Sequence, residues 1–227
     1  MLFRSDQALN QQIAAAGYQF SSANSINIGR LIPQVAYYVF AYLQLVSQGV
    51  IALGDAINVD VPTGNFGNIL AAYYARQMGL PIKTFICASN KNNVLTDFFK
   101  TGVYDRQRPF YVTNSPSMDI LISSNLERLI YHATGNDAAQ TAAYMKQLVD
   151  QGHYQVTPQM QATYADFYGG YADEAQIEAS IKAVYEATGY VLDPHTAVAT
   201  SVYSDYRQET GELPRSEERR VGKECRS

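Results

Sequence analysis

The chain has 227 residues, 47% of them hydrophobic and 17% charged, with a formal net charge of −4 at pH 7. This length is enough for one substantial domain with a buried core, or for a large piece of a bigger fold. Proteins that bind nucleic acid carry basic faces, and an acidic chain whose only basic run comes in its last residues is not typical of that class.

The start of the chain and its cysteines bear on where the protein works. Arg4, Asp6 and Gln7 interrupt the start before an apolar stretch can form, so no secretory signal peptide is predicted. Cys87 lies in an apolar run and Cys225 in a charged one, and the two give neither a disulfide framework nor zinc-binding spacing. We therefore expect a cytoplasmic protein without a metal site.

Two helical patterns come first along the chain. Residues 2–16 are typical of the end of a helix that is already packed on something, which suggests that the chain begins within a fold. Residues 30–49 are apolar on nearly every face and predict a buried helix with Pro33 in its first turn. Three glutamines within this run, together with Pro33, argue against a helix that spans a membrane.

The most informative stretch is a strand, a tight loop and a helix in succession. Ile57, Val59 and Val61 alternate as in a strand, and an Ala- and Leu-rich helix pattern runs from residue 69 to Gly79. The loop between them is Pro62-Thr63-Gly64-Asn65-Phe66-Gly67-Asn68. Such a loop directs several backbone N–H groups at one point, where the helix dipole adds positive potential. The loop therefore suits a phosphate.

Two common phosphate-binding patterns do not fit this loop. A Walker P-loop needs a Lys followed by Ser or Thr, which does not come after Gly67. The dinucleotide fingerprint needs a third glycine beyond Gly64 and Gly67, and none stands at the required place. An ordinary tight turn between a strand and a helix stays open as the alternative to an anion site.

A second strand over residues 82–88 completes a strand–helix–strand unit and hence predicts a parallel pair. The polar loop 89–93 follows at the carboxyl end of that strand, where open α/β sheets place ligands, but we assign it no role. The pattern then predicts a helix over 94–100, a short strand over 110–112, and a helix over 116–133 with Ser115 as cap and Pro116 first.

The last third is mostly helical by pattern. Between residues 137 and 189 we expect helices separated by turns at Gly152, near Pro158 and at Gly169-Gly170. A short strand over 190–192 then precedes a helix that Asp193 caps and Pro194 begins.

The end of the chain differs in character. Residues 215–227 hold five basic and three acidic residues, a composition typical of a disordered segment. Residues 217–227 also resemble a read-through sequence, so we treat 215–227 as a foreign or artefactual charged tail outside the fold. A native basic tail is the alternative.

Several separated motifs occur in the order in which the threonine synthase family has them, and together they are more specific than any one alone. They are Asn24-Ser25-Ile26-Asn27 leading to Arg30, Val61-Pro62-Thr63-Gly64-Asn65-Phe66-Gly67-Asn68, Ser89-Asn90-Lys91-Asn92-Asn93, Ser115-Pro116-Ser117-Met118-Asp119-Ile120, and Asp193-Pro194-His195-Thr196-Ala197. The chain resembles this family from about residue 20 to about residue 212. The resemblance implies a helix-rich and incomplete α/β fold, in which residues 1–214 are the C-terminal portion of the parallel-sheet large domain of a fold type II, tryptophan synthase β-like, pyridoxal-phosphate enzyme.

The resemblance also implies a lyase of threonine biosynthesis, which uses pyridoxal 5'-phosphate to convert O-phosphohomoserine and water to L-threonine and phosphate. Gly64, Asn65, Phe66, Gly67 and Asn68 would hold the phosphate of the cofactor, largely by their backbone N–H groups, in agreement with the chemistry of the loop. Small molecules would then be the partners, and we expect neither nucleic acid nor a membrane.

Further residues are candidates by their place in the family's motifs. Thr196 would face the pyridine nitrogen, to which a hydroxyl can hydrogen-bond, although a polar residue in a first helical turn is the alternative. Asn24, Asn27 and Arg30 could lie near the substrate, since a guanidinium matches phosphate or carboxylate, but an exposed helix start is equally expected. His195 has no paired carboxylate in view, which favours a structural role over acid–base work.

One departure from the family bears on catalysis. The family forms a Schiff base between the cofactor and a lysine on a Phe-Lys-Asp type motif upstream of these segments, and this chain has no such motif. The nearest match, Phe98-Phe99-Lys100-Thr101-Gly102, follows the phosphate loop and lacks the Asp. We therefore assign no catalytic residue and expect no full reaction by this chain alone. Another fold type II pyridoxal-phosphate lyase and a non-catalytic anion-binding module stay open as alternatives.

A partial fold has a physical consequence. Missing strands would leave open sheet edges and exposed apolar faces.

Overall fold

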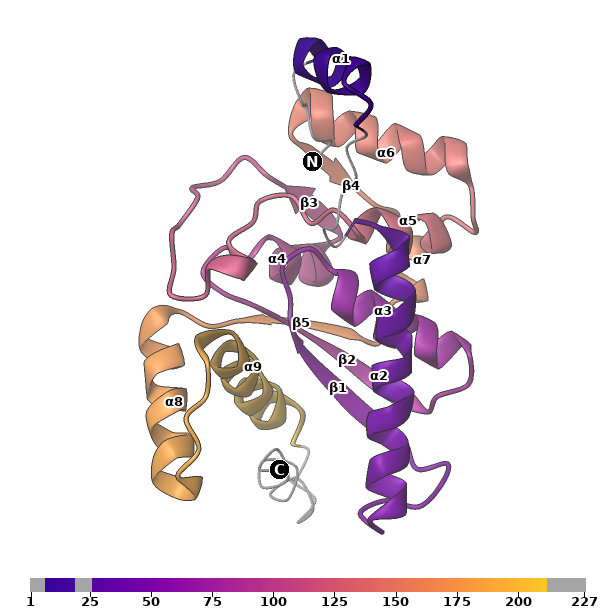
Figure 1. Cartoon of the computed structure of the whole chain (residues 1–227). Coiled ribbons are helices and arrows are strands. Elements are labelled where there is room, and N and C mark those ends of the chain that lie inside the picture. The colour runs from indigo at the N-terminus through magenta and orange to yellow at the C-terminus, as the bar shows by residue number, and fades with distance from the viewer. Residues whose placement is uncertain (1–6, 19–25, 212–227) are drawn as a thin grey trace.

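The computed structural model describes residues 7–18 and 26–211, in which three strands form one parallel sheet (Figure 1). The strands are β1 (Ile57–Pro62), β2 (Ile82–Ser89) and β5 (Phe167–Tyr171), and their order in the sheet is β1-β2-β5. Val59 of β1 pairs with Phe85 of β2, and Phe85 pairs with Phe167 of β5. The carboxyl ends of all three strands therefore lie at one edge of the sheet.

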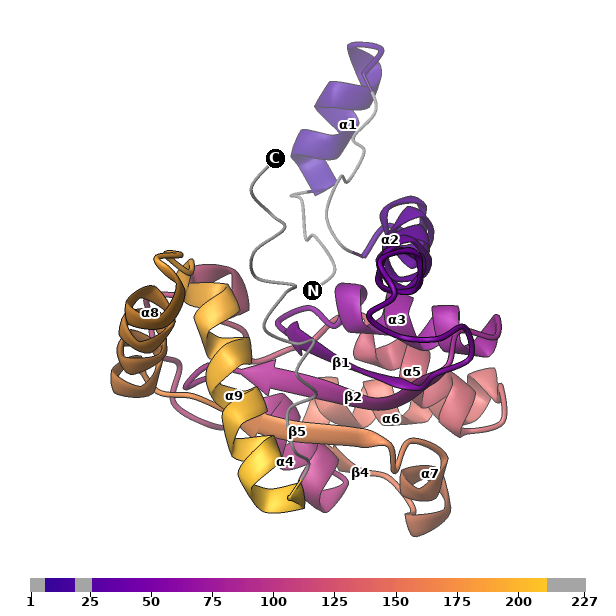
Figure 2. The ribbon, with the colours of Figure 1, turned by 90° about the horizontal axis from the view of Figure 1, so that it is seen from below.

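Helices cover both faces of this sheet (Figure 2). Helix α9 (Pro194–Thr210) packs on one face, and α8 (Glu174–Thr188) packs on α9. On the other face lie α3 (Gly67–Gln77) and α4 (Val94–Thr101), and α2 (Ile28–Ser47) packs outside α3. The remaining elements are α1 (Gln7–Ala15), α5 (Leu126–Ala133), α6 (Ala138–Gln151), α7 (Pro158–Thr163), a 3-10 turn (Pro116–Met118), and an antiparallel pair of β3 (Val103–Asp105) with β4 (His153–Gln155).

Aromatic rings fill the core between the sheet and α4. The rings of Phe85 and Phe167, on neighbouring strands, stack with centroids 4.6 Å apart, and Phe99 stacks on Phe167 at 5.1 Å. Phe66, from the loop after β1, joins the same stack within 6.0 Å of Phe99. Offset stacks of this kind contribute stability beyond the area that they bury, so the loop after β1 is tied directly to the core.

The strand–loop–helix–strand prediction over residues 57–88 is confirmed, including the parallel pairing. The helix over 94–100 is confirmed as α4, and Asp193 caps α9 by accepting from the backbone N–H groups of His195 and Thr196. The predicted α/β class, helix-rich with a parallel sheet, is thus what the structure shows. The charged tail over 215–227 and the candidate Asn24 lie outside the described residues.

The predicted turn at Gly169-Gly170 is wrong, because both glycines lie inside β5. A Cβ on Gly169 would stand 3.0 Å from the Cα of Thr96 in α4, and a Cβ on Gly170 would stand 2.4 Å from Cγ1 of Val202 in α9. The two glycines therefore let helices approach both faces of the same strand. Glycine has low strand propensity, so the hydrophobic pattern of this segment does not predict a strand.

The strands predicted over 110–112 and 190–192 are also wrong. The backbone N–H of Tyr111 donates to Oδ1 of Asn92 at 2.9 Å, and the Tyr111 carbonyl accepts from Nδ2 of Asn92 at 2.9 Å, so a side chain takes the place of a neighbouring strand. The N–H of Tyr190 donates to Oγ1 of Thr188 at 3.1 Å instead of to a strand. Hydrophobic pattern alone does not reveal such local competition for the backbone.

The helix predicted over 116–133 is shorter than expected and begins later in the chain. Ser115 makes no side-chain cap, Pro116–Met118 forms a single 3-10 turn, and α5 begins only at Leu126. Between them, Ser123 donates its backbone N–H to Tyr104 Oη at 2.7 Å and its hydroxyl to the carbonyl of Gly64 at 2.7 Å. Tertiary partners therefore replace the helical hydrogen bonds of this segment.

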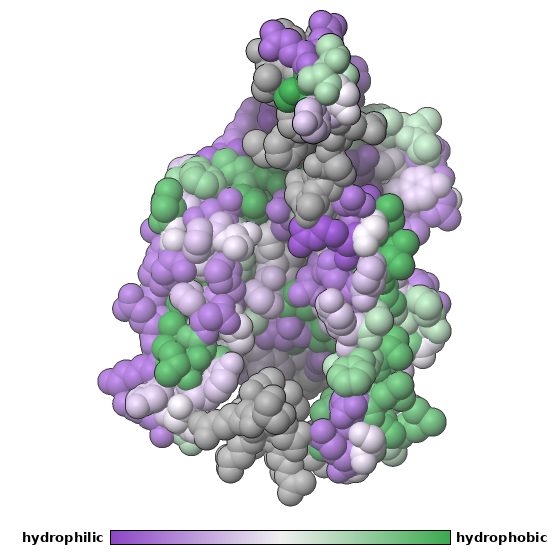
Figure 3. All heavy atoms as spheres, in the orientation of Figure 1, coloured by the Kyte–Doolittle hydropathy of each residue, from purple (hydrophilic) through white to green (hydrophobic). Residues whose placement is uncertain are grey.

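Helix α2 was expected to be buried, and the structure buries only one face of it. Figure 3 shows apolar side chains gathered along α2 at the surface. A groove of about 760 Å³ lies between α2 and α3, lined by Ile32, Val35, Ala36, Val39, Phe40, Leu43, Tyr74, Gln77 and Met78.

Among the described residues, β1 is also an edge strand of its sheet. No described helix is long and apolar enough to cross a membrane.

The packing at Gly170 gives a first prediction. Gly170→Ala should lower the free energy of unfolding by about 1–3 kcal/mol, because the added methyl group overlaps Val202. Val202→Ala removes the atom in conflict, so the double variant should lose less stability than the sum of the two single losses. Urea unfolding of the four proteins measures this, and a Gly170→Ala variant as stable as the parent would contradict the packing.

Asp60 gives a second prediction. Its Oδ1 is enclosed without a partner among the described residues, and burial raises the pKa of its carboxyl group well above the usual range, although a hydrogen bond from Val61 acts in the opposite direction. The folded state therefore prefers protonated Asp60, so its contribution to stability is present below the unfolded pKa of about 3.9 and is lost as pH rises toward the folded pKa.

Asp60→Asn should accordingly be more stable than the parent near pH 7, with the advantage shrinking toward pH 4. Chemical unfolding at both pH values measures the difference. Gln147→Asn, on the exposed side of α6, introduces and removes no titratable group and serves as a control whose effect should be the same at both pH values. An Asp60→Asn effect that is equal at both pH values would rule out a buried, titrating Asp60.

Candidate functional site

The predicted anion loop lies at the carboxyl end of β1 and leads into the N-terminus of α3. The backbone N–H of Thr63 donates to the carbonyl of Ala88 at 2.8 Å, which keeps the loop beside the end of β2. Phe66 adopts a left-handed backbone with φ of 63°, while its side chain is only 1% exposed. A bulky residue rarely adopts this conformation, so the buried ring holds the loop in a strained turn.

Two carbonyl groups of the loop accept hydrogen bonds from residues outside the loop. Gly64 accepts from the Ser123 hydroxyl at 2.7 Å, and Asn65 accepts from the backbone N–H and Nδ2 of Asn125 at 3.1 and 2.8 Å. Among the described residues, we find no acceptor for the backbone N–H groups of residues 64–68. Five consecutive donors thus lead into the positive end of α3, and a run of N–H groups of this kind can bind an anion.

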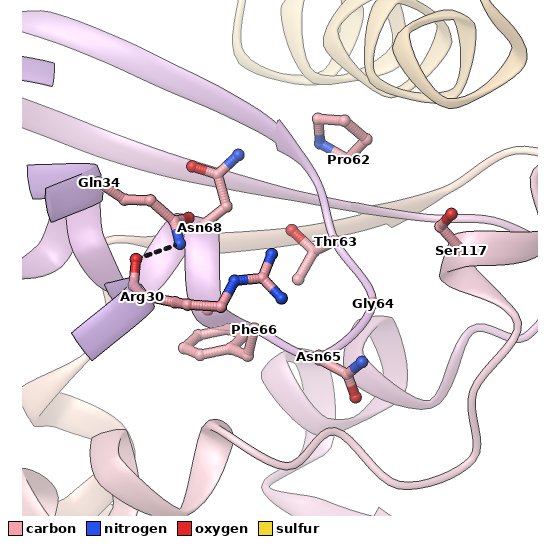
Figure 4. A pocket seen from close by; sticks show the side chains of 10 residues that line it. Arg30, Gln34, Pro62, Thr63, Gly64, Asn65, Phe66, Asn68 and Ser117 are labelled. Atoms are coloured by element: carbon pink, nitrogen blue, oxygen red, sulfur yellow. Dashed lines mark hydrogen bonds between the residues drawn. The ribbon is translucent and has the colours of Figure 1, made fainter. Parts of the chain in front are cut away.

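A cavity of about 200 Å³ opens at these donors (Figure 4). It is lined by Arg30, Gln34, Pro62, Thr63, Gly64, Asn65, Phe66, Gly67, Asn68 and Ser117. All five predicted phosphate-loop residues therefore line the same cavity. Among the described residues, no group of three or more His, Cys, Asp or Glu side chains is placed to hold a metal ion.

Helix α2 supplies one wall of this cavity. The side chain of Arg30 points toward the loop that carries Thr63 and Gly64 (Figure 4), and Gln34 Nε2 donates to the backbone carbonyl of Arg30 at 2.7 Å. Tyr38 Oη donates to Oδ1 of Asn68 at 2.6 Å, which fixes the orientation of that amide. A cation beside a cluster of N–H donors makes the cavity more favourable for an anion.

The candidate Asn27 has a structural role in this fold. Its side chain accepts from the backbone N–H of Gly29 at 2.8 Å and so caps α2. It does not line the cavity. Both Asn27 and Arg30 are exposed at the start of α2, as the alternative expected, and Arg30 also lines the cavity.

The opposite wall is the backbone around Ser117. A Cβ on Gly64 would stand 2.8 Å from the carbonyl oxygen of Ser117 and 3.2 Å from the Cα of Met118. Only glycine allows the two backbones to approach this closely. The loop and the Ser117 segment, more than fifty residues apart in sequence, therefore form one site.

The start of α9 contacts this wall from behind. His195 Nε2 accepts from the backbone N–H of Ser117 at 3.3 Å, and His195 Nδ1 lies 3.2 Å from Oδ1 of Asp193. The expectation that His195 has no paired carboxylate is wrong, because Asp193 two residues earlier is its partner. The pairing fits a structural link between α9 and the cavity wall.

Thr196 does not line the cavity in this structure. Its hydroxyl donates to Oδ2 of Asp193, and this bond is the main reason why the pKa of Asp193 is lowered. Thr196 follows His195 directly, so it stands next to the residue that contacts the wall. Its expected contact with a cofactor ring stays a prediction.

Several lining or supporting residues could not be found from sequence. Gln34 lines the cavity, and Tyr38, Ser123 and Asn125 form hydrogen bonds with the loop from distant segments. Ser117 lay within a recognised motif but received no role. No local signal identifies such residues, because tertiary structure alone brings them to the loop.

The lysines near the site are not directed at it. Lys91, in the loop after β2, places its ammonium group 4.5 Å from the centre of the Tyr111 ring. Lys100 is exposed in the last turn of α4. Neither residue lines the cavity.

Comparisons with known proteins agree with this geometry. No protein-family model matches the chain. The chain is 50% identical over 196 residues to human "Threonine synthase-like 1". The aligned part makes up 86% of this chain and 26% of that protein. It is 36% identical over 202 residues to the threonine synthase of Schizosaccharomyces pombe, with 80% of this chain and 39% of that protein covered.

A solved structure is also similar. The pyridoxal-phosphate-bound threonine synthase from Brucella melitensis aligns with a TM-score of 0.79 and 38% sequence identity, over 88% of this chain and 43% of that one. Over these proteins the chain spans between 26% and 43% of their own length. The chain is therefore threonine synthase-like, with the fold of the type II pyridoxal-phosphate enzymes over the part of those proteins that it spans.

Proposed function

We propose that this chain holds the phosphate of pyridoxal 5'-phosphate in the loop of residues 64–68. The observation that carries the proposal is the set of five backbone N–H groups without an acceptor among the described residues, gathered at the N-terminus of α3. A phosphate dianion would satisfy several of them at once, with favourable charge from the helix dipole.

The residues present fit the phosphate group of the cofactor in charge and in size. The cavity of about 200 Å³ is lined by one cation, Arg30, and by no carboxylate. Gly64, Asn65, Phe66, Gly67 and Asn68 would hold the phosphate, and Thr196 would hydrogen-bond to the pyridine nitrogen. When bound, the cofactor supplies an electron sink for the substrate's carbanion.

We further propose that the protein to which this sequence corresponds converts O-phosphohomoserine and water to L-threonine and phosphate in the cytoplasm. The relatives named threonine synthase support this reaction. Arg30 would pair with an anionic group of the substrate, since its fork-shaped guanidinium matches phosphate or carboxylate. Because this chain has no Phe-Lys-Asp motif, we expect it to bind the cofactor without turning over substrate.

A second candidate is another lyase reaction of the same fold type. The observation that favours it is the higher identity, 50% against 36%, to a protein named threonine synthase-like than to one named threonine synthase. The cofactor site would be the same in both cases. The two candidates differ only in the substrate, so O-phosphohomoserine turnover by the longer protein distinguishes them.

Gly67→Asp tests the cofactor site. The new carboxylate would stand among the N–H donors and repel the phosphate, so the affinity of the chain for pyridoxal phosphate should fall at least about tenfold. Gln77→Asp places the same charge at the other end of α3 and should leave the affinity within about twofold of the parent. Fluorescence titration measures both, and inorganic phosphate should compete with the cofactor.

Two results would contradict the proposal. One is the absence of saturable binding by the parent chain at millimolar cofactor. The other is equal affinity of the Gly67→Asp and Gln77→Asp variants, which would place the cofactor elsewhere.

A further inference from the structure

A network of polar side chains joins the loop after β2 to the segment that forms the Ser117 wall. Asn90 and Asn92 are only 1% and 3% exposed, and Ser115 is fully buried. Buried polar groups are costly unless they are hydrogen-bonded. Their partners therefore show what this network holds in place.

Asp119 is the acceptor at the centre of the network. Its Oδ1 accepts from Asn90 Nδ2 at 2.8 Å, from Asn92 Nδ2 at 3.1 Å and from Thr113 Oγ1 at 2.7 Å. Its Oδ2 accepts from the backbone N–H of Thr113 at 3.0 Å. Asp119 thus closes the chain into a loop over residues 113–119 and ties that loop to the carboxyl end of β2.

This closed loop carries the wall of the anion cavity. Ser117 lines the cavity, and its carbonyl lies where a Cβ on Gly64 would be only 2.8 Å away. Met118, next in the chain, is buried against α9 and β2. Three contacts therefore fix the position of this wall: the packing of Met118, the hydrogen bond from Ser117 to His195, and the bonds that Asp119 accepts.

We propose that Asp119 is a positioning residue for the anion site, which holds the backbone of Ser117 and Met118 at the distance from Gly64 that the bound phosphate needs. Asn90 and Asn92 act through Asp119 by donating to it. This inference rests on the proposed function, because the anion concerned is the phosphate of pyridoxal phosphate. It assigns a role to the polar loop after β2, which lies outside the cavity lining.

Asp119→Asn in the full 227-residue chain tests the inference. Every group that bonds to the Asp119 carboxylate is a donor, so the NH₂ of the new amide faces a donor in either orientation: the Thr113 backbone N–H, or the NH₂ groups of Asn90 and Asn92. We expect the affinity for pyridoxal phosphate and for inorganic phosphate to fall about tenfold or more. We also expect the induced circular dichroism of the bound cofactor to weaken at saturation, because a displaced wall orients it less tightly.

A double-mutant cycle separates positioning through Asp119 from general stability. Asn90→Ala should lower the affinity for pyridoxal phosphate about threefold or more in the parent. It should change the affinity little in the Asp119→Ala background, because Asn90 acts through Asp119. Thr141→Ala removes a different buried hydroxyl, which donates to the Asp137 carbonyl at 2.8 Å far along the chain, and should leave the affinity unchanged even if the melting temperature falls.

The outcomes distinguish the two proposals. A parent chain that binds neither pyridoxal phosphate nor inorganic phosphate overturns the proposed function and this inference together. The inference alone is overturned if the parent binds and Asp119→Asn has equal affinity. It is also overturned alone if Asn90→Ala costs as much affinity in the Asp119→Ala background as in the parent. If Asp119→Asn does not fold, Thr113→Val removes one of the four bonds to Asp119, and the same comparison of affinities decides.

Discussion

The site depends on one constraint: the five consecutive backbone N–H groups of residues 64–68, which lead into α3, have no acceptor within residues 7–18 and 26–211. A buried or half-buried N–H group without an acceptor costs free energy. The fold tolerates this cost because the rest of the loop is held from several sides: the ring of Phe66 by the aromatic stack, the carbonyls of Gly64 and Asn65 by Ser123 and Asn125, and Thr63 by β2. The donors are therefore arranged before any anion arrives.

The same constraint explains why small residues and distant segments meet here. Gly64 has no side chain because the Ser117 backbone occupies that space, and the glycines of β5 let α4 and α9 close on the two faces of the sheet. Helix α9 in turn reaches the back of the Ser117 wall through His195. Packing of the sheet and geometry of the anion site are thus coupled through a few close backbone approaches.

How much of this could be predicted depended on whether the determining contacts were local. The alternation in β1, the glycines of its loop and the Asp193 cap are local, and each was predicted correctly. The strand β5 could not be predicted, because the reason for Gly169 and Gly170 is their close packing against α4 and α9, which is a tertiary contact. The segment after Ser115 also failed as a helix. The Asp119 side chain bonds back to Thr113, and Ser123 bonds to Tyr104 and Gly64 instead of to the preceding turn. Resemblance to threonine synthases supplied the identity of the anion, which no physical argument from the loop alone could give.

The proposed site places the phosphate of pyridoxal phosphate on the backbone N–H groups of residues 64–68. Backbone amide resonances of the isotope-labelled chain, followed by NMR during titration with pyridoxal phosphate and then with inorganic phosphate, test it at the atoms concerned. If the phosphate binds there, the amides of residues 64–68 should show the largest saturable shifts with both ligands. Saturable shifts confined to other segments, or none at millimolar ligand, would contradict it.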